Sequence, residues 1–324
     1  MFTSDSHRPV SPWPVPLLYK VSALVHLAAL VLLVIHAEWW PVAVVALVVN
    51  HAVICASSLL PRSQWIGRNV IRLPGASARR GELALTIDDG PDPHVTPAVL
   101  DLLAHHGVRA SFFCIADRAE RHPELVTRIV AEGHEVHNHT ARHDHRFSLL
   151  GPAAFRREIG SAQATLARLA GVRPTCFRAP AGLRNIMLSP VLHELGLTLV
   201  SWTRRGYDTR ERDPARVLAR LIGPGLRGGD ILLLHDGHAA RDALGAPVLL
   251  AVLPALFEQA RLAGLSWVTL GDALNDPVIA AAGQAATPGA ATSSGPGDKT
   301  IDPATAHQHA GHNHSRLPAR TYAR

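Results

Sequence analysis

The sequence predicts an α/β protein built on parallel strands, because short apolar runs alternate with helical patterns from Arg79 to Asn275. Repeated strand–helix units place neighbouring strands parallel, in an open sheet or in a barrel. Polar residues cluster after the strands, at the ends where enzymes of both kinds carry their chemistry. The predicted strands are 83–87, 109–115, 134–138, 175–178, 197–201, 230–234 and 266–269, and the predicted helices are 95–106, 117–132, 152–170, 187–195, 214–222 and 247–263.

Composition indicates a membrane-associated protein. The 324-residue chain carries a net charge of +6, is 47% hydrophobic and has a mean hydropathy of +0.11, which is high for a wholly soluble protein. Nearly all of the positive charge is Arg, and no Arg run interleaves with aromatic residues, so a nucleic-acid partner is not expected. The basic residues after Leu60 suit anionic lipid headgroups better, which makes membrane lipids the expected partners.

Two apolar runs near the N-terminus, 15–35 and 40–60, are each about one membrane thickness long. Only four residues separate them, so a tight hairpin is expected. A signal peptide cleaved near Ala37 is the alternative, but the first run is long for a signal core and a second run follows at once. The polar groups inside the runs either act in the membrane or hydrogen-bond across the helix pair; they are His26, Asn50 and His51.

Basic residues flank the apolar hairpin on both sides, whereas its turn has none. The positive-inside rule therefore places both ends in the cytoplasm, with the protein integral to the cytoplasmic (inner) membrane. Arg68 and Arg72 alternate with apolar residues and could form an amphipathic helix along the membrane surface. The expected order is a polar N-terminus (1–14), two transmembrane helices (15–60), a basic juxtamembrane segment (61–80), a domain (81–275) and a disordered His-rich tail (276–324).

The first chemical motif follows the strand at 83–87. Asp88 and Asp89 come where this apolar run gives way to Gly90-Pro91. Neighbouring side chains at a strand end point in different directions, so one carboxylate can bind a metal while the other faces the group bound there. The structural alternative is an acidic turn, since Asp-Asp-Gly-Pro is good turn chemistry.

The second motif follows the third predicted strand. His139 and His143 have i, i+4 spacing, and on one helical turn both imidazoles would face one metal ion. With a carboxylate from another strand end, two imidazole nitrogens form a catalytic type of site that leaves a position for water. His137 would point to the opposite side of its strand from Asn138, so it is left out.

Further candidate site residues lie at or after the ends of the fourth, fifth and sixth strands. Each has a bland alternative as a surface Arg, a loop Asp or a core His, but all of them in this order indicate one site. They are Arg178, Trp202, Tyr207, Asp208 and, within the sixth strand and at its end, Leu233 and His235.

These motifs resemble the polysaccharide deacetylases of the NodB-homology type, carbohydrate esterase family 4, over roughly Leu83–Leu274. The resemblance implies a distorted (β/α) barrel over 81–275 and one divalent metal, usually Zn²⁺. It implies Asp88 as general base and His235 as general acid, and it places Leu233 in the acyl pocket. Arg178 would hold Asp88 and Asp208 would orient His235, while the implied metal ligands are Asp89, His139 and His143.

The chemistry of amide hydrolysis requires these residue types. The water nucleophile needs a base, and the departing nitrogen needs a proton. The Arg178–Asp88 and Asp208–His235 pairings would give these two groups separate electrostatic environments. A backbone N–H near Ala181 would help to stabilise the oxyanion.

Two positions depart from the family pattern. Ala181 stands where an aromatic residue is usual, and Thr209 stands where Trp is usual. The lost rings would line the sugar and acyl pockets, and Trp202 or Tyr207 would have to replace them. The expected substrate is therefore an acylated amino sugar that is lipid-linked or close to the membrane, rather than polymeric chitin.

Other functions stay open at this point. The same site would hydrolyse O-acyl esters or formyl groups. A catalytically silent carbohydrate-binding protein is a second class, and a metal-handling membrane protein that uses the His-rich tail is a third. The filled catalytic positions favour the enzyme.

Overall fold

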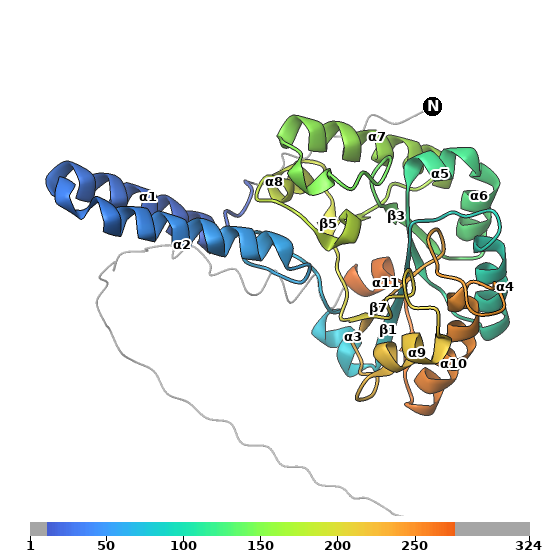
Figure 1. Ribbon diagram of the computed structural model, residues 1–324. Helices are drawn as coiled ribbons and strands as arrows, with labels where there is room; N and C mark the ends of the chain where they lie inside the picture. Colours follow the sequence, from blue (N-terminus) through green and yellow to red (C-terminus); the bar gives the residue numbers. More distant parts are fainter. Residues whose placement is uncertain (1–11, 276–324) are drawn as a thin grey trace, which may run out of the picture. The chain divides into compact units, whose positions relative to one another are not determined.

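A curled, all-parallel sheet forms the centre of the domain in the computed structural model, which describes residues 12–275 (Figure 1). The strand order is β5-β4-β3-β2-β1-β7-β6, and β8 pairs with the start of β1. No pairing joins β5 to β6 among these residues, so the predicted distorted barrel is confirmed as an open, incomplete one. The strands are β1 (Glu82–Asp88), β2 (Ser111–Cys114), β3 (Glu135–Asn138), β4 (Cys176–Phe177), β5 (Thr198–Leu199), β6 (Arg204–Arg205), β7 (Ile231–His235) and β8 (Ser266–Trp267).

Strand β1 is the central strand because its side chains are buried on both faces. Every residue from Leu83 to Asp88 is buried, as expected for an apolar strand inside a parallel sheet. Its register places Asp88 beside His235 of β7 and beside Phe113 of β2. Since parallel strands end at the same edge, this register brings together the residues that follow β1 and β7.

Helices cover the outside of the sheet, and their apolar faces complete the core (Figure 1). The predicted helix at 117–132 is two helices, because Pro123 has no N–H to continue the first one. Strand β6, with only two residues, both Arg, was not predicted. The helices of the domain are α3 (Gly75–Arg79), α4 (Thr96–His106), α5 (Ala116–Arg121), α6 (Pro123–Ala131), α7 (Pro152–Ala170), α8 (Leu188–Glu194), α9 (Pro214–Ile222), α10 (Val248–Leu262) and α11 (Leu270–Leu274).

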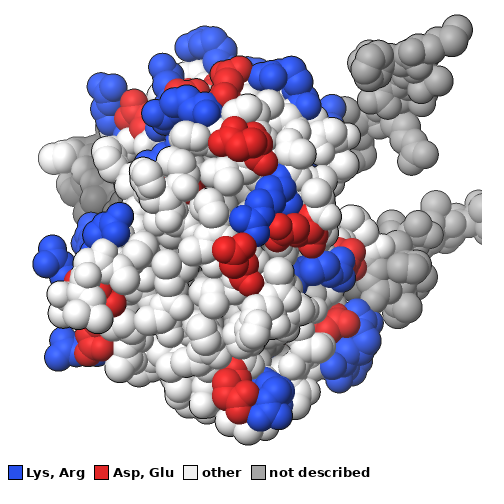
Figure 2. Space-filling model, turned by 90° about the vertical axis from the view of Figure 1, so that its right-hand side faces the viewer, with Lys and Arg blue, Asp and Glu red and all other residues white. Residues whose placement is uncertain are grey.

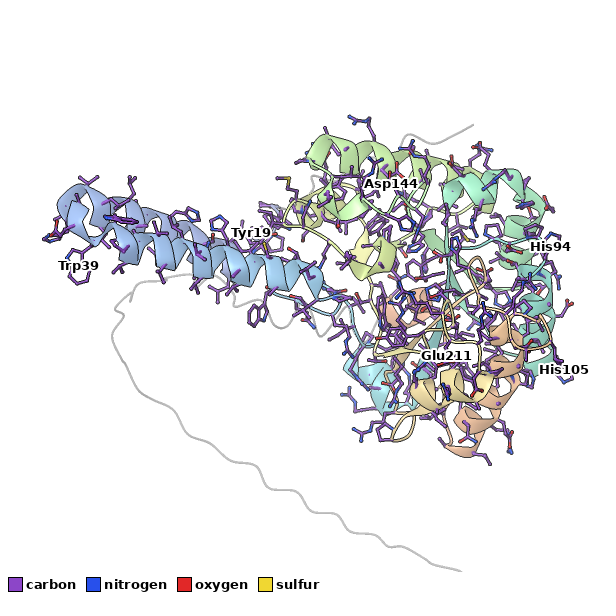
Figure 3. All side chains as sticks on the ribbon, in the orientation of Figure 1. Tyr19, Trp39, His94, His105, Asp144 and Glu211 are labelled. Carbon is purple, nitrogen blue, oxygen red and sulfur yellow. The ribbon has the colours of Figure 1, made fainter. Side chains whose placement is uncertain are left out.

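Two N-terminal helices, α1 (Leu17–Ile35) and α2 (Trp40–Leu59), form the predicted apolar hairpin. The side-chain amide of Asn50 donates to Ser22 Oγ at 3.0 Å, so this polar group does bond across the pair. Both spans are long and apolar enough to cross a membrane, and most of their side chains are exposed, unlike those of a soluble core helix. In Figure 3, Trp39 lies at the turn of the hairpin and Tyr19 at its other end.

The segment between α2 and α3 does not form the amphipathic helix that its sequence suggested. The N–H of Val70 donates to the Leu199 carbonyl at 2.9 Å, and the N–H of Ser201 donates to the Val70 carbonyl at 2.8 Å. Ile66 is fully buried. Ile66 and Leu73 are therefore covered by protein at the edge of the sheet, although Trp65 stays exposed, and the segment follows the sheet edge instead of forming a surface helix.

The loop after β4 is hydrogen-bonded to the chain that leaves α2. The Arg184 N–H donates to the Ser58 carbonyl at 3.3 Å, and the Arg184 guanidinium binds the Ser63 carbonyl. The Tyr19 hydroxyl donates to the Ile186 carbonyl at 2.7 Å. Burial lowers the pKa of Arg184 to about 10. This loop, which begins at Ala179, is thus fixed against the end of the apolar hairpin.

Charges of both signs lie next to each other on the face shown in Figure 2, and neither sign gathers there. Several surface pairs join neighbouring elements; for example, Arg128 lies 2.5 Å from Asp101 and 2.6 Å from Glu132. Exposed pairs of this kind contribute little to stability. This face therefore offers no concentrated field for a charged partner.

The glycine at position 182 provides a test of the contact between the loop and the hairpin. Gly182 has φ +73°, and a Cβ there would overlap Pro61 and Trp202, whereas Gly196, with φ +68°, has open space around it. We expect Gly196→Ala to cost about 1–2 kcal/mol through backbone strain alone. Gly182→Ala should cost clearly more, measured as the thermal unfolding midpoint in detergent. Equal losses would contradict the close packing of Pro61 on this loop.

Candidate active site

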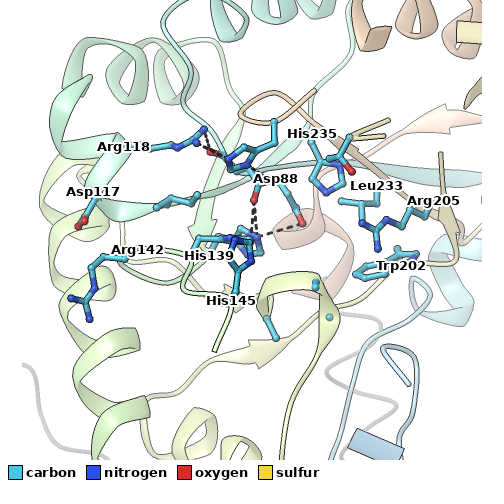
Figure 4. Close-up of a pocket in the computed structure, with 18 of the residues that line it drawn as sticks. Asp88, Asp117, Arg118, His139, Arg142, His145, Trp202, Arg205, Leu233 and His235 are labelled. Atoms are coloured by element: carbon cyan, nitrogen blue, oxygen red, sulfur yellow. Dashed lines mark hydrogen bonds and ion pairs between the residues drawn. The ribbon is translucent and has the colours of Figure 1, made fainter. Parts of the chain in front are cut away.

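A pocket of about 590 Å³ lies where β1, β3, β4 and β7 end (Figure 4). Asp88, His139 and His235 lie around its centre (Figure 4). Strand ends supply most of these groups because β1, β3 and β7 run parallel and finish at one edge. The sequence-predicted residues that line it are Asp88, Asp89, His139, His143, Ala181, Trp202, Leu233 and His235.

Three of the predicted residues, Asp89, His139 and His143, form a group that fits a metal ion, the metal-type cluster. Asp89 Oδ1 lies 3.2 Å from His139 Nε2 and 3.4 Å from His143 Nε2. This carboxylate oxygen is buried and has no hydrogen-bond partner among the described residues. His139 Nδ1 donates to the Arg178 carbonyl at 2.8 Å, which leaves Nε2 as the ligand atom. One carboxylate oxygen and two imidazole nitrogens are a donor set that suits zinc and similar divalent ions.

The histidine pair meets through a loop and not through the helical turn that its spacing suggested. Thr140 and His143 have positive φ, which an α-helix excludes. The Asn138 side chain accepts the Thr140 N–H at 2.9 Å, and Thr140 Oγ1 accepts the His143 N–H at 2.9 Å. These local bonds bend the chain so that the two imidazole centroids lie 4.9 Å apart.

Asp88 is held by a buried arginine. Arg178 Nη1 donates to Asp88 Oδ1 at 2.6 Å and to Thr86 Oγ1 at 2.9 Å. The other two guanidinium nitrogens, Nε and Nη2, donate to two backbone carbonyls. The guanidinium carbon lies 4.1 Å from the ring centroid of Phe113. Burial lowers the pKa of Arg178, and the Asp88 charge opposes that change. The second oxygen, Asp88 Oδ2, lies 3.9 Å from His139 Nε2, so it faces the metal-type cluster.

His235 stands on the other side of this cluster with its own carboxylate. Its Nδ1 lies 2.9 Å from Asp208 Oδ1, and its backbone N–H donates to Asp208 Oδ2 at 2.7 Å. Asp208 is completely buried. Burial lowers the pKa of His235, but the Asp208 carboxylate together with the charges of Asp89 and Asp88 more than offsets this and raises the pKa to about 9. The imidazole is therefore protonated at neutral pH.

Three of the four residues predicted to form the pocket wall line the pocket, and the fourth does not. Trp202, Leu233 and Ala181 line the pocket, and so does Thr209, which occupies the second departing position. Tyr207 does not line it; its side chain is half exposed and lines a neighbouring cavity instead. Tyr207 has a positive φ of 61°, and its ring lies 5.0 Å from the Arg205 guanidinium carbon instead. His137 lies outside the pocket as expected, 3.0 Å from Glu135 Oε2.

His238 and Arg118 belong to the site although sequence reasoning missed them. His238 Nδ1 donates to Asp89 Oδ2 at 2.9 Å, and Arg118 donates to His238 Nε2 at 2.9 Å. Arg118 also binds the Asp89 carbonyl at 3.0 Å. The His238 bond holds one carboxylate oxygen of Asp89 and leaves the other for a metal. Burial raises the pKa of Asp89, but His139 and His238 outweigh this and keep the pKa well below its usual value. The signal was available, since His238 comes three residues after His235.

A further buried carboxyl, Asp236, supports the turn after β1. Asp236 Oδ2 accepts the Thr96 hydroxyl at 2.5 Å, while Oδ1 has no partner among the described residues. Burial raises the pKa of Asp236 to about 7. A Cβ at Gly90 would overlap this carboxyl, which explains the glycine in the Asp-Asp-Gly-Pro motif.

Comparisons with known proteins agree with this geometry. Residues 75–200 match the family model described as polysaccharide deacetylase. The chain is 38% identical over 155 residues to a chitooligosaccharide deacetylase of Bradyrhizobium sp. (strain ANU 289), which covers 48% of this chain and 70% of that protein. It is 33% identical over 193 residues to a peptidoglycan-N-acetylglucosamine deacetylase of Bacillus cereus, and this match covers 59% of this chain and 87% of that protein.

Among solved structures, the peptidoglycan N-acetylglucosamine deacetylase Bc1960, in complex with an N-hydroxybenzamide, superposes with a TM-score of 0.57. The sequence identity is 28%, and the match covers 63% of this chain and 92% of that one. The fold, the order of the strand-end motifs and these similarities lead to one assignment. The chain belongs to the polysaccharide deacetylase family, carbohydrate esterase family 4, whose members are hydrolases that act on amide bonds.

Proposed function

We propose that this protein is a membrane-anchored, metal-dependent deacetylase that removes an N-acetyl group from an amino sugar close to the membrane. The observation that carries the proposal is the pairing of opposite charges around the metal-type cluster. Arg178 is paired with the carboxylate of Asp88 on one side, and Asp208 is paired with a protonated His235 on the other. A base and an acid are thus placed beside the same three ligands.

Each residue has a definite task in hydrolysis. A divalent ion, most simply Zn²⁺, held by Asp89, His139 and His143 would supply Lewis-acid activation. Asp88 Oδ2 takes a proton from the attacking water, because Arg178 occupies the other oxygen. His235 gives its proton to the departing nitrogen, while Asp208 holds the ring and stabilises its charge.

A proton donor that stays charged at neutral pH supports amide cleavage in particular. An amine is a poor leaving group until it is protonated, whereas an alkoxide leaves more readily from an ester. The raised pKa of His235 keeps its proton available. The relatives named as deacetylases of chitooligosaccharide and of peptidoglycan N-acetylglucosamine support an N-acetylated amino sugar as the substrate class.

The position of the pocket relative to the apolar hairpin supports a membrane-proximal substrate. Gly182 lines the pocket, and there is no room for a Cβ between it and Pro61, two residues after α2 ends at Leu59. The Ser201 hydroxyl also donates to the Pro61 carbonyl at 2.7 Å. With two helices long enough to span a bilayer, this contact favours a lipid-linked saccharide over a soluble polymer. The cytoplasmic orientation expected from the flanking Arg residues remains part of the proposal.

Metal binding tests the ligand roles directly. Purified protein should hold one tightly bound divalent ion, measured by elemental analysis after dialysis. Asp89→Ala should lose it, because the orphaned carboxylate oxygen is a ligand. His238→Ala should weaken metal affinity by about 10–100-fold through the loss of outer-shell support. Removing residues 276–324 should leave the one equivalent in place; loss of most of the metal would favour storage by the His-rich tail.

The pH dependence of deacetylation tests the His235 assignment. Protonated His235 is the active form, and the nearby carboxylates, chiefly Asp208, raise its pKa to about 9, so the rate should fall only above about that pH. In Asp208→Asn the pKa drops, and the alkaline limb of kcat/KM should move to lower pH by at least about one unit. The readout is acetate release from an N-acetylglucosaminyl lipid in neutral detergent. An unchanged alkaline limb would rule out His235 as the proton donor.

A further inference from the structure

A second cavity, of about 680 Å³, adjoins the active-site pocket. Trp202 and Arg205 line both of them. Pro61 and Arg62, immediately after the end of α2, also line the second cavity. The cavity therefore lies between the catalytic pocket and the point where the chain leaves the apolar hairpin.

The charges around this cavity do not balance. Five arginines line it, together with one carboxylate, Asp230. Both carboxylate oxygens of Asp230 are paired, Oδ1 with Arg72 at 2.9 Å and Oδ2 with Arg204 at 2.7 Å. A third lining residue, Arg220, lies 3.0 Å from Glu211. Three of the five arginines thus have carboxylate partners.

The other two arginines, Arg62 and Arg205, have no carboxylate partner among the described residues. Arg62 donates only to the Thr203 carbonyl, at 3.2 Å. The Arg205 side chain has no hydrogen-bond acceptor in the described part of the chain, and its Nε is buried without one. A buried guanidinium nitrogen without an acceptor is costly, so a bound anion at this point would satisfy it.

Aromatic rings hold the Arg205 guanidinium in place. Its central carbon lies 5.4 Å from the ring of Trp202 and 5.0 Å from the ring of Tyr207. Arg205 and Trp202 lie together at one side of the catalytic pocket (Figure 4). These cation–π contacts position the guanidinium without using any of its N–H groups, which leaves them for the two-pronged recognition of a phosphate.

We propose that Arg205 and Arg62 bind the phosphate of a glycosyl phospholipid substrate. This inference rests on the proposed function and names its substrate class. Trp202 connects the two cavities, so a phosphate beside Arg205 places the attached sugar at the catalytic pocket. Arg62 lies three residues beyond the last residue of α2, so the lipid chain on the other side of the phosphate would point toward the bilayer.

The test compares two substrates that differ only in the phosphate: decyl N-acetylglucosaminyl phosphate and the uncharged decyl N-acetylglucosaminide. Arg205→Met keeps an apolar stem between the rings and removes the charge, and Arg62→Met leaves Trp202 untouched. Each should lower kcat/KM for the phosphate substrate by about tenfold or more, chiefly through KM, and change the uncharged substrate less than about twofold. Arg261→Gln, on an exposed pair of α10, is the matched control and should change neither.

Binding of decyl phosphate, measured by calorimetry in neutral detergent, separates the two proposals. Wild-type binding that Arg205→Met and Arg62→Met weaken about tenfold would support the phosphate site even if neither sugar were hydrolysed, and the proposed function would then be wrong. Turnover of both substrates with equal kcat/KM, unaffected by either variant, would overturn the phosphate site and leave the deacetylase. Effects of the variants that appear on both substrates, and only in vesicles containing phosphatidylglycerol, would assign the arginines to a bilayer headgroup and also overturn it.

Discussion

The buried ion pair between Arg178 and Asp88 is the interaction on which the site depends. Arg178 is completely buried, and its N–H groups reach β1 and the chain that follows β5. A guanidinium in such a place is stable only when it is paired and hydrogen-bonded, and removing one partner of such a pair typically costs about 3–5 kcal/mol. The same pair fixes the direction of the Asp88 carboxylate. The stability of the fold and the orientation of the catalytic base therefore both require the Arg178–Asp88 pair.

The proposed acid, His235, and the proposed base, Asp88, lie on neighbouring strands but in separate electrostatic environments. Asp88 and His235 are neighbours in the register of β1 and β7, yet each has its own buried counter-charge. Asp89, one residue after Asp88, is turned by a positive φ of 74° toward the two histidines. His238 and Arg118 then hold its other oxygen and its carbonyl. A register of parallel strands thus provides the positions, and the loops that follow provide the orientations.

Most of the sheet and the metal-type cluster could be predicted from the sequence, because strand periodicity and strand-end motifs are local signals. The predictions that failed depended on side-chain hydrogen bonds within a loop or on contacts between distant segments. The helical turn at His139–His143 was wrong because Asn138 and Thr140 bond the backbone into a loop. The segment that carries Arg68 and Arg72 was expected along the membrane surface, but its Ile66 is buried against the domain. Tyr207 was expected in the pocket, but it lines the adjoining cavity beside Arg205, and spacing alone does not predict either contact.

The most direct measurement is acetate release from an N-acetylglucosaminyl phospholipid, with metal content determined on the same preparations of wild type and Asp88→Asn. The proposed roles predict about one bound metal ion in both proteins and a loss of activity of about 10²–10⁴-fold in the variant, since only the base is removed. Equal activity in the two proteins, or efficient turnover of soluble chitin oligomers with none of the lipid-linked sugar, would contradict a membrane-proximal deacetylase that uses Asp88.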